Sequence, residues 1–191
     1  MFSDESAFDV APRRCQFVRR GRGSSLTVSH TVASRPFLQK VMVWGCFDYN
    51  GCGPLVPVIG TMNATKYRDV LESNLLPFVA ENYPSNDYIL QHDNAPCHKA
   101  IFVRNFLNTN GIHTIDWPPY SPDLAPIENL WAIVKRKVHE HTITTRNVLL
   151  SRLDDIWRND EDVRTACKAL VDSMPRRVRA CVVSKGGPIK Y

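Results

Sequence analysis

The sequence has no CxxC pair among its six cysteines and no cysteine spacing typical of a zinc module. We therefore expect reduced thiols that mostly pack in the interior, with no disulfide framework. No apolar run approaches the roughly 18 residues that cross a bilayer, and residues 1–20 lack the apolar segment of a secretory signal. These absences predict a protein that is not secreted and has no membrane partner.

What is present is an ordinary globular composition, with 43% apolar and 23% charged residues over 191 positions. Chains of this kind have enough apolar material for one hydrophobic core, which excludes disordered, collagen-like and coiled-coil proteins. No repeat, low-complexity tract or linker interrupts the chain. We expect a single domain over residues 1–191.

Positive charge is concentrated at the two ends of the chain. The net charge is +5, yet residues 173–191 alone hold five Lys or Arg and no acid, and we treat them as a basic C-terminal tail. Arginine clusters of this kind suit a DNA phosphate backbone, although a solubilising surface explains them equally well. The candidate DNA-binding residues are Arg19, Arg20, Arg22, Arg176, Arg177 and Arg179.

The first half of the chain has the pattern of a strand meander followed by a helix. Short β-branched and aromatic runs predict strands at 15–19, 41–47 and 55–59, the last two joined by a glycine-rich turn. Apolar residues then recur at helical spacing over 65–82, with Asn63 available as the N-cap.

The second half alternates strand and helix and ends in helices. Strands are predicted at 88–92 and 112–116, with a helix at 100–107 between them, which indicates parallel pairing. A proline-rich loop (residues 117–126) leads into helices at about 127–139, 144–158 and 160–174. The fold class is therefore α/β with a mixed sheet: an antiparallel three-strand meander plus parallel strands with flanking helices. This is the element order of a ribonuclease-H-like fold, and several α+β folds share its first half.

Asp93 is the first candidate for chemistry. It directly follows the apolar strand 88–92 and opens a loop that leads into a helix, which is where open α/β sheets place their active sites. A local role explains it about as well, because Asp often forms an Asx turn or an N-cap. His92 and His98 flank this loop, but neither forms a recognisable zinc site with its neighbours.

Glu128 is the second candidate. Ile127, Leu130 and Trp131 belong to the apolar stripe of its helix, and Glu128 lies at the edge of that stripe, where it could line a cleft. The first turn of a helix also favours a negative charge. A capping box is the ordinary explanation for a Glu here, but Ala125 at the cap position cannot accept the hydrogen bond.

Five motifs stand in order along the chain: SDESAF at 3–8, VWGCF at 43–47, QHDNAPCH at 91–98, WP at 117–118 with SPDLAPIENLW at 121–131, and SMPRR at 173–177. Together they resemble the catalytic domain of Tc/mariner-type transposases, in the DDE superfamily of transposases and integrases. Between Asp93 and Glu128 lie 34 residues, the spacing of the Tc branch, which has Glu as its third acid.

The resemblance implies a ribonuclease-H-like fold and a catalytic triad of Asp4, Asp93 and Glu128 that binds two Mg²⁺ or Mn²⁺ ions. Carboxylate oxygens suit these cations, and acids this close would repel one another without them. Asn94 and His98 would support the triad. The implied reaction is cleavage and strand transfer of double-stranded DNA at transposon ends, by a protein of the nucleus that could act as a homodimer and needs no small-molecule cofactor.

Two departures from the family pattern lower the expected activity. The usual Asn before the Pro-Ile-Glu sequence is Ala125 here, which removes an N-cap worth about 1 kcal/mol. Only three residues precede Asp4, so we expect an N-terminally truncated domain that has no sequence-reading region and whose first strand is too short to hold Asp4 firmly. Transposition by this chain alone should be weak or absent.

Two alternatives stay open. A catalytically inactive, transposon-derived remnant could keep the fold and bind nucleic acid, and it would tolerate Asp93→Asn. A nuclease of the same fold could act on RNA–DNA hybrids, which it would recognise by their 2′-hydroxyls.

Overall fold

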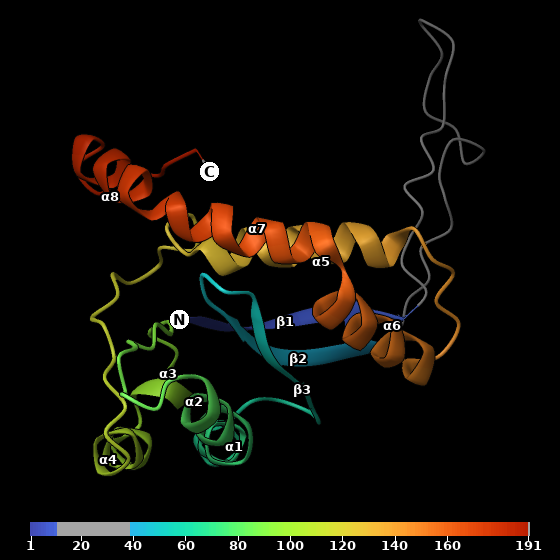
Figure 1. Ribbon diagram of the computed structural model, residues 1–191, viewed down its shortest axis with the longest axis horizontal. Coiled ribbons are helices and arrows are strands. Elements are labelled where there is room, and N and C mark those ends of the chain that lie inside the picture. The colour runs from blue at the N-terminus through green and yellow to red at the C-terminus, as the bar shows by residue number, and fades with distance from the viewer. Residues whose placement is uncertain (11–38, 191) are drawn as a thin grey trace, which may run out of the picture.

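The computed structural model describes residues 1–10 and 39–190 (Figure 1). Three strands come first: β1 (Phe2–Asp9), β2 (Lys40–Phe47) and β3 (Cys52–Val58). Helices follow: α1 (Ala64–Val70), the π-helical segment η2 (Leu71–Leu75), α2 (Leu76–Asn82), α3 (Pro96–Lys99), α4 (Ile101–Thr109), α5 (Pro126–His139), α6 (Arg146–Asn159), α7 (Glu161–Asp172) and α8 (Met174–Val183).

The three strands form an antiparallel sheet in the order β1-β2-β3, which confirms the predicted antiparallel meander. The predicted strand 15–19 lies outside the described residues, and β1 takes the first place instead. The expectation that Asp4 sits on a strand too short to hold it is wrong. β1 has eight residues and pairs with β2 along its whole length, with Asp4 opposite Gly45.

The sheet is covered on both faces because β2 is apolar on both sides. Val41, Val43 and Phe47 point to one face, where they pack with α5, α6 and α7. Trp44 and Cys46 point to the other face and pack with the helices from α1 to α4. Figure 1 shows the resulting layers, with the sheet between two groups of helices.

Parallel pairing is present only as single bridges within the described residues. Gln91 bridges Phe2 and Leu90 bridges Thr114, both in parallel orientation. Ser3 N donates to Gln91 O at 2.9 Å, so the 88–92 segment is attached to the open edge of β1. The extended parallel strands predicted at 88–92 and 112–116 are not confirmed.

The helices largely follow their predicted positions. Asn63 caps α1 by accepting from Lys66 N at 2.9 Å, and α1, η2 and α2 together cover the predicted helix at 65–82. The helix α8 was not predicted: much of the supposed tail at 173–191 is helical. No helix of the described part of the chain is both long and apolar enough to span a bilayer.

Candidate active site

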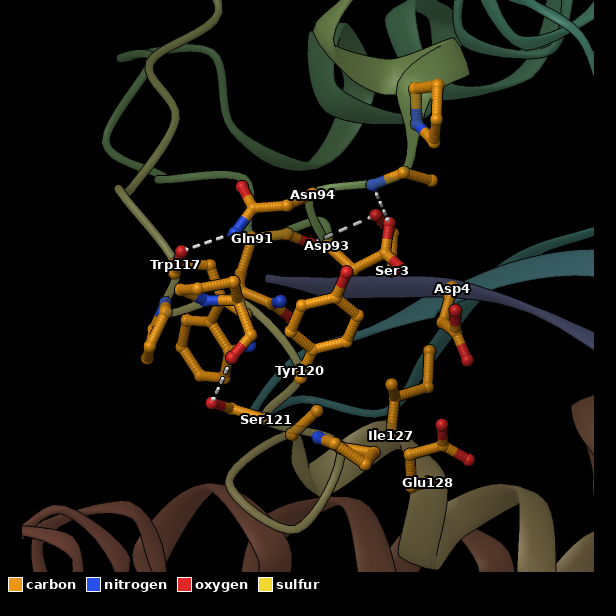
Figure 2. Close-up of a pocket in the computed structure, with 16 residues that line it drawn as sticks. Ser3, Asp4, Gln91, Asp93, Asn94, Trp117, Tyr120, Ser121, Ile127 and Glu128 are labelled. Atoms are coloured by element: carbon orange, nitrogen blue, oxygen red, sulfur yellow. Dashed lines mark hydrogen bonds between the residues drawn. The ribbon is translucent and has the colours of Figure 1, made fainter. Parts of the chain in front are cut away.

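Three acidic residues from separate elements line one pocket of about 390 Å³ (Figure 2). Asp4 comes from β1, Asp93 from the segment that follows Gln91, and Glu128 from the first turn of α5. The proline-rich loop forms another wall of the pocket, from Trp117 to Pro122. These are the three acids that the sequence analysis singled out, and the fold brings them together.

The alternation of side chains along β1 explains why Asp4 reaches this pocket. Asp4 lies on the same face as Phe8, which packs against Trp131 of α5. Its neighbour Glu5 points to the opposite face, toward α3, where it contacts His98. Figure 2 shows the Asp4 and Glu128 carboxylates on the same side of the pocket. Adjacent residues of one strand therefore serve two different polar clusters.

Asp4 is held in an environment that opposes its negative charge. Burial, together with the nearby charges of Glu128 and Glu5, raises the pKa of Asp4 to about 7. A cation placed between Asp4 and Glu128 would remove this repulsion. The electrostatics thus favour a site that binds a positive charge.

Within the described residues, the hydrogen bonds of the Asp93 side chain use one carboxylate oxygen. Its Oδ1 accepts from Ala95 N at 2.9 Å and lies 2.7 Å from His98 Nδ1. The bond to His98 is the main reason that the pKa of Asp93 is lowered. No described residue forms a hydrogen bond with Oδ2 of Asp93, so this oxygen is available to a ligand. The Asx-type turn and the ligand role are compatible in this arrangement.

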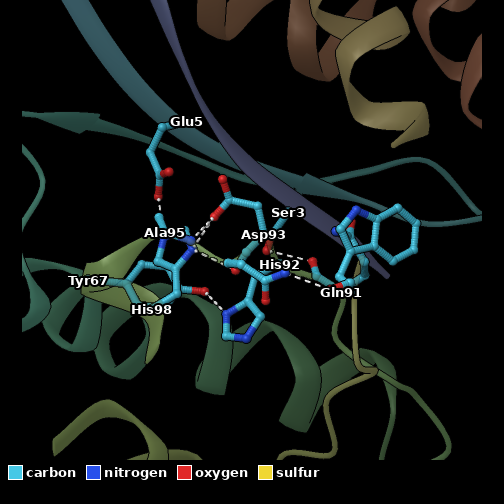
Figure 3. A network of polar contacts seen from close by, with 10 residues as sticks. Ser3, Glu5, Tyr67, Gln91, His92, Asp93, Ala95 and His98 are labelled. Atoms are coloured by element: carbon cyan, nitrogen blue, oxygen red, sulfur yellow. Dashed lines mark hydrogen bonds and ion pairs between the residues drawn. The ribbon is translucent and has the colours of Figure 1, made fainter. Parts of the chain in front are cut away.

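His98 is the centre of a buried polar network (Figure 3). Its Nδ1 faces Asp93 and its Nε2 lies 3.2 Å from Glu5 Oε1. Burial opposes the charged imidazole, but the hydrogen bonds to the two carboxylates outweigh it and raise the pKa of His98 to about 10. His98 is therefore a doubly protonated donor at neutral pH, and it connects β1 to the Asp93 segment.

His92 has the opposite charge state although its ring stacks on that of His98 at 5.2 Å. Burial and the charge of His98 lower the pKa of His92 to about 4. Its Nδ1 lies 2.8 Å from the hydroxyl of Tyr67, whose pKa burial raises well above the usual value. The Tyr67 hydroxyl is thus the donor and the neutral His92 is the acceptor.

Asn94 supports a wall of the pocket. Its Nδ2 donates to the carbonyl oxygen of Trp117 at 2.6 Å, which ties the Asp93 segment to the start of the proline-rich loop. The predicted supporting residues Asn94 and His98 thus hold different partners: Asn94 holds Trp117, and His98 holds Asp93 and Glu5.

The donor set of the pocket fits a hard divalent cation. Besides the three carboxylates, the pocket is lined by Gln91, whose buried Oε1 has no hydrogen-bond partner in the described part of the protein. Oxygen donors of this kind suit Mg²⁺ or Mn²⁺ rather than zinc. As the side chains lie, however, no group of three or more His, Cys, Asp or Glu in residues 1–10 and 39–190 is close enough to hold a metal ion.

The six arginines predicted to bind DNA fall into three groups according to where the structure places them. Arg19, Arg20 and Arg22 lie outside the described residues. Arg176 and Arg179 are exposed on α8, where a phosphate could reach them. Arg177 requires a correction, because only 2% of it is exposed and its guanidinium is hydrogen-bonded inside the fold. An arginine at the inner face of a helix is not placed to contact DNA.

Sequence reasoning missed Glu5, Tyr67 and Gln91. Gln91 lies in the predicted strand 88–92 and Glu5 directly follows the candidate Asp4, but only the pairing of β1 with the 88–92 segment shows what they face. Tyr67 lies in the predicted helix 65–82, and the residue that its hydroxyl contacts lies 25 residues away. A motif alone carries no signal for these contacts.

Comparison with known proteins identifies the family of the chain. The DDE superfamily endonuclease family matches residues 1–149. This chain belongs to that family. It is 34% identical to the transposable element Tcb1 transposase of Caenorhabditis briggsae and 32% identical to the Tc1 transposase of Caenorhabditis elegans, covering all of this chain and 70% of each relative. The resemblance to Tc/mariner transposase catalytic domains is confirmed.

Solved structures of the Mos1 transposase share the fold of this DDE endonuclease domain. The Mos1 mariner paired-end complex with Mn superposes with a TM-score of 0.85 at 25% identity, over 99% of this chain and 56% of that chain. The catalytic domain of Mos1 mariner transposase superposes with a TM-score of 0.76 at 24% identity, over 99% of this chain and 83% of that domain. The mixed α/β, ribonuclease-H-like part of the fold prediction is thereby confirmed, whereas its parallel strands are not.

Proposed function

We propose that this DDE endonuclease domain cuts and joins DNA strands in transposition, with Asp4, Asp93 and Glu128 as its catalytic acids. The observation that carries the proposal is that these three acids, from β1, the Asp93 segment and α5, line a single pocket. The relatives are named as transposases of mobile elements. The reaction is an in-line displacement at phosphorus, in which water, and later a DNA 3′-hydroxyl, forms one P–O bond while another breaks.

The acids of the pocket would hold two Mg²⁺ or Mn²⁺ ions. When bound, such ions activate the attacking oxygen and stabilise the charge on the leaving oxygen. Support comes from the oxygen-only donor set, from the free Oδ2 of Asp93, and from the repulsion between Asp4 and Glu128. Mos1 structures are described with Mg and with Mn.

His98 and Asn94 would position Asp93 and the pocket wall. His98 fixes one oxygen of Asp93, which limits the directions in which the other oxygen can point. Asn94 holds the proline-rich loop at Trp117, so that the wall stays at a set distance from Asp93. Neither residue would contact the reacting phosphate.

Double-stranded DNA is the proposed partner, at transposon ends. Arg176 and Arg179 are exposed and offer positive charge to its backbone. A Mos1 neighbour is described as a paired-end complex with a left transposon end. By analogy we also propose a homodimer on DNA and a site of action in the nucleus.

A plasmid-nicking assay tests the proposal. Supercoiled plasmid is incubated with the full chain and Mn²⁺ or Mg²⁺, and open-circle product is quantified. We expect nicking that EDTA abolishes, and a loss of at least about 100-fold for Asp93→Asn and for Glu128→Gln, because each removes a charged ligand.

Asp87→Asn provides the matched control, since Asp87 is an exposed acid outside the pocket. This variant should nick DNA like the wild type. Nicking that survives Asp93→Asn would contradict the proposed triad, and wild-type protein that binds plasmid without nicking it would support an inactive nucleic-acid-binding remnant. An RNA–DNA hybrid cleaved in preference to plasmid would favour the hybrid-nuclease alternative.

A further inference from the structure

Arg177 joins three separate segments of the chain. It lies on α8, where its Nε donates to Ser173 Oγ at 2.8 Å. Its Nη1 donates to the carbonyl oxygen of Asp123 at 3.0 Å, and its Nη2 donates to Asn129 Oδ1 at 2.7 Å. The planar guanidinium therefore links α8 to the proline-rich loop and to the first turns of α5 at the same time.

Both of the distant partners lie beside the pocket. Asp123 directly follows Pro122, which lines the pocket, and lies two residues before Ala125, which lines it as well. Asn129 directly follows Glu128 on α5. In Figure 1, α8 lies at the end of the helical layer where α5 begins. A shift of Arg177 would thus displace the pocket wall and Glu128.

Asp123 receives a second contact from the C-terminal segment. Its Oδ2 accepts from the backbone N–H of Ile189 at 2.7 Å, while its Oδ1 accepts from Leu124 N at 3.1 Å. The segment after α8 thus returns to the same residue of the proline-rich loop whose carbonyl oxygen Arg177 binds. Two independent contacts from the C-terminal end therefore converge on this loop.

The first turn of α5 is packed through the buried Pro126 and Ile127, but among the described residues no side chain caps it. Ala125 at its N-cap offers no side-chain hydrogen bond, and Glu128 itself is exposed. Side-chain caps ordinarily satisfy the free N–H groups of the first turn and define how the chain enters the helix. In α5 the entry is instead held from outside, by the Arg177 bonds on both sides of residues 124–128.

We propose that Arg177 is a positioning residue for Glu128 and the pocket wall. It acts through Asn129 and Asp123 and touches neither DNA nor metal. The inference rests on the proposed function in so far as Glu128 serves as a metal ligand. It assigns to the second arginine of the SMPRR motif a structural task, distinct from the DNA contact that its charge suggests.

Arg177→Lys is the main test variant, because Lys keeps the positive charge but cannot donate to three separated acceptors in one plane. Hydrogen–deuterium exchange of the metal-free protein is measured for peptides over residues 117–130, and Mn²⁺ affinity is measured by electron paramagnetic resonance. We expect exchange in these peptides about 10-fold faster and Mn²⁺ binding about 10-fold weaker. Peptides of β2 and β3 should keep their wild-type exchange.

Arg164→Lys is the control for the substitution itself, since Arg164 is exposed on α7 and its ion pair with Glu161 lies at 3.7 Å. Asn129→Ala removes only the contact to α5 and decides the question if Arg177→Lys does not fold. Unchanged exchange at 117–130 in the folded variants would overturn the inference, as would unchanged Mn²⁺ affinity. If the wild type binds no Mn²⁺, the proposed function fails, and the exchange data still decide whether Arg177 holds the loop and α5.

Discussion

Asp93 Oδ1 lies 2.7 Å from Nδ1 of His98, and the other nitrogen of the same ring lies 3.2 Å from Glu5. One imidazolium thus joins the segment that carries Asp93 to the strand that carries Asp4. Because His98 is 2% exposed, water does not compete for these contacts. The relative placement of two of the three pocket acids therefore depends on a buried positive charge.

Replacing His98 by Gln should destabilise the protein in a pH-dependent way. The folded state raises the pKa of His98 from 6.5 to about 10, so the stabilisation is present in full below pH 6.5 and disappears as the pH rises through 10. We expect a loss of about 2 kcal/mol at pH 6 and a much smaller loss at pH 10. Urea denaturation at several pH values measures it.

The exposed His139 of α5 provides the comparison, and His139→Gln should change stability by less than about 0.5 kcal/mol at every pH. Equal losses for His98→Gln at pH 6 and pH 10 would show that the ring acts by packing alone.

Asp4→Asn should stabilise the metal-free protein at alkaline pH. An unfolded Asp4 ionises near pH 3.8, whereas folding raises its pKa to about 7, so the folded state binds the proton more tightly and wild-type stability falls as the pH rises from about 4 to 7. Asn carries no charge and avoids this loss. In EDTA, thermal melts should show that Asp4→Asn is more stable than the wild type by on the order of 2 kcal/mol at pH 8, and by little at pH 4.

Mn²⁺ should make the wild type the more stable of the two proteins. The cation stabilises the wild type by binding to it, whereas Asp4→Asn has lost one of the proposed metal ligands. Asp87→Asn, at an exposed position, should leave the melts unchanged in EDTA and in Mn²⁺. If the wild type and Asp4→Asn melt at the same temperature at pH 8 in EDTA, the ionised Asp4 does not destabilise the folded protein, and the prediction is wrong.

Gly45→Ala should destabilise the sheet, because a Cβ at this position would lie 2.8 Å from Cη2 of Trp131. Trp157 Cζ2 would lie 3.1 Å away, and the two indole rings stack at 4.8 Å, so neither can retreat easily. We expect a loss of about 2 kcal/mol in the free energy of unfolding. The double variant with Trp131→Phe should lose less than the sum of the single changes, and strict additivity would mean that the contact is not the cause.

Sequence patterns predicted the elements whose cause is local. Helical spacing over 65–82, with Asn63 as the cap, needs no distant partner, and the structure has a helical segment there. β1 was not predicted as the strand Phe2–Asp9, because its pairing with β2 stabilises it and its own sequence is mostly polar. The same holds for α8, whose inner face is fixed by the bonds of Arg177 to other segments.

The residues of the site also fall into two groups: those that a local pattern predicts and those that depend on distant contacts. Asp93 and Glu128 could be proposed from their places after a strand and at the start of a helix, together with their family spacing. The contact between Glu5 and His98 spans 93 residues and depends on the register of β1, on the bridge to Gln91 and on the position of α3. No local pattern contains that information, and the role of Arg177 could not be predicted for the same reason.

The two buried thiols, Cys46 and Cys167, and the partly exposed Cys52 should resist alkylation in the native protein. Cys52 Sγ lies 3.6 Å from Cys167 Sγ, and this hydrogen bond, together with burial, raises the pKa of Cys52. Burial likewise raises the pKa of Cys46, and Cys167 is fully buried. Since the thiolate is the reactive form, these three positions should react slowly.

Iodoacetamide labelling with peptide mapping by mass spectrometry checks this. Cys97 and Cys181 are partly exposed, and they should be alkylated at least about tenfold faster than Cys46, Cys52 and Cys167 at pH 7.5. In concentrated urea the five positions should react at similar rates, because unfolding removes both burial and the contact between Cys52 and Cys167. Rapid native labelling of Cys167 would show that α7 opens from β3 far more often than its packed interface implies, since the reagent reaches that thiol only through such an opening.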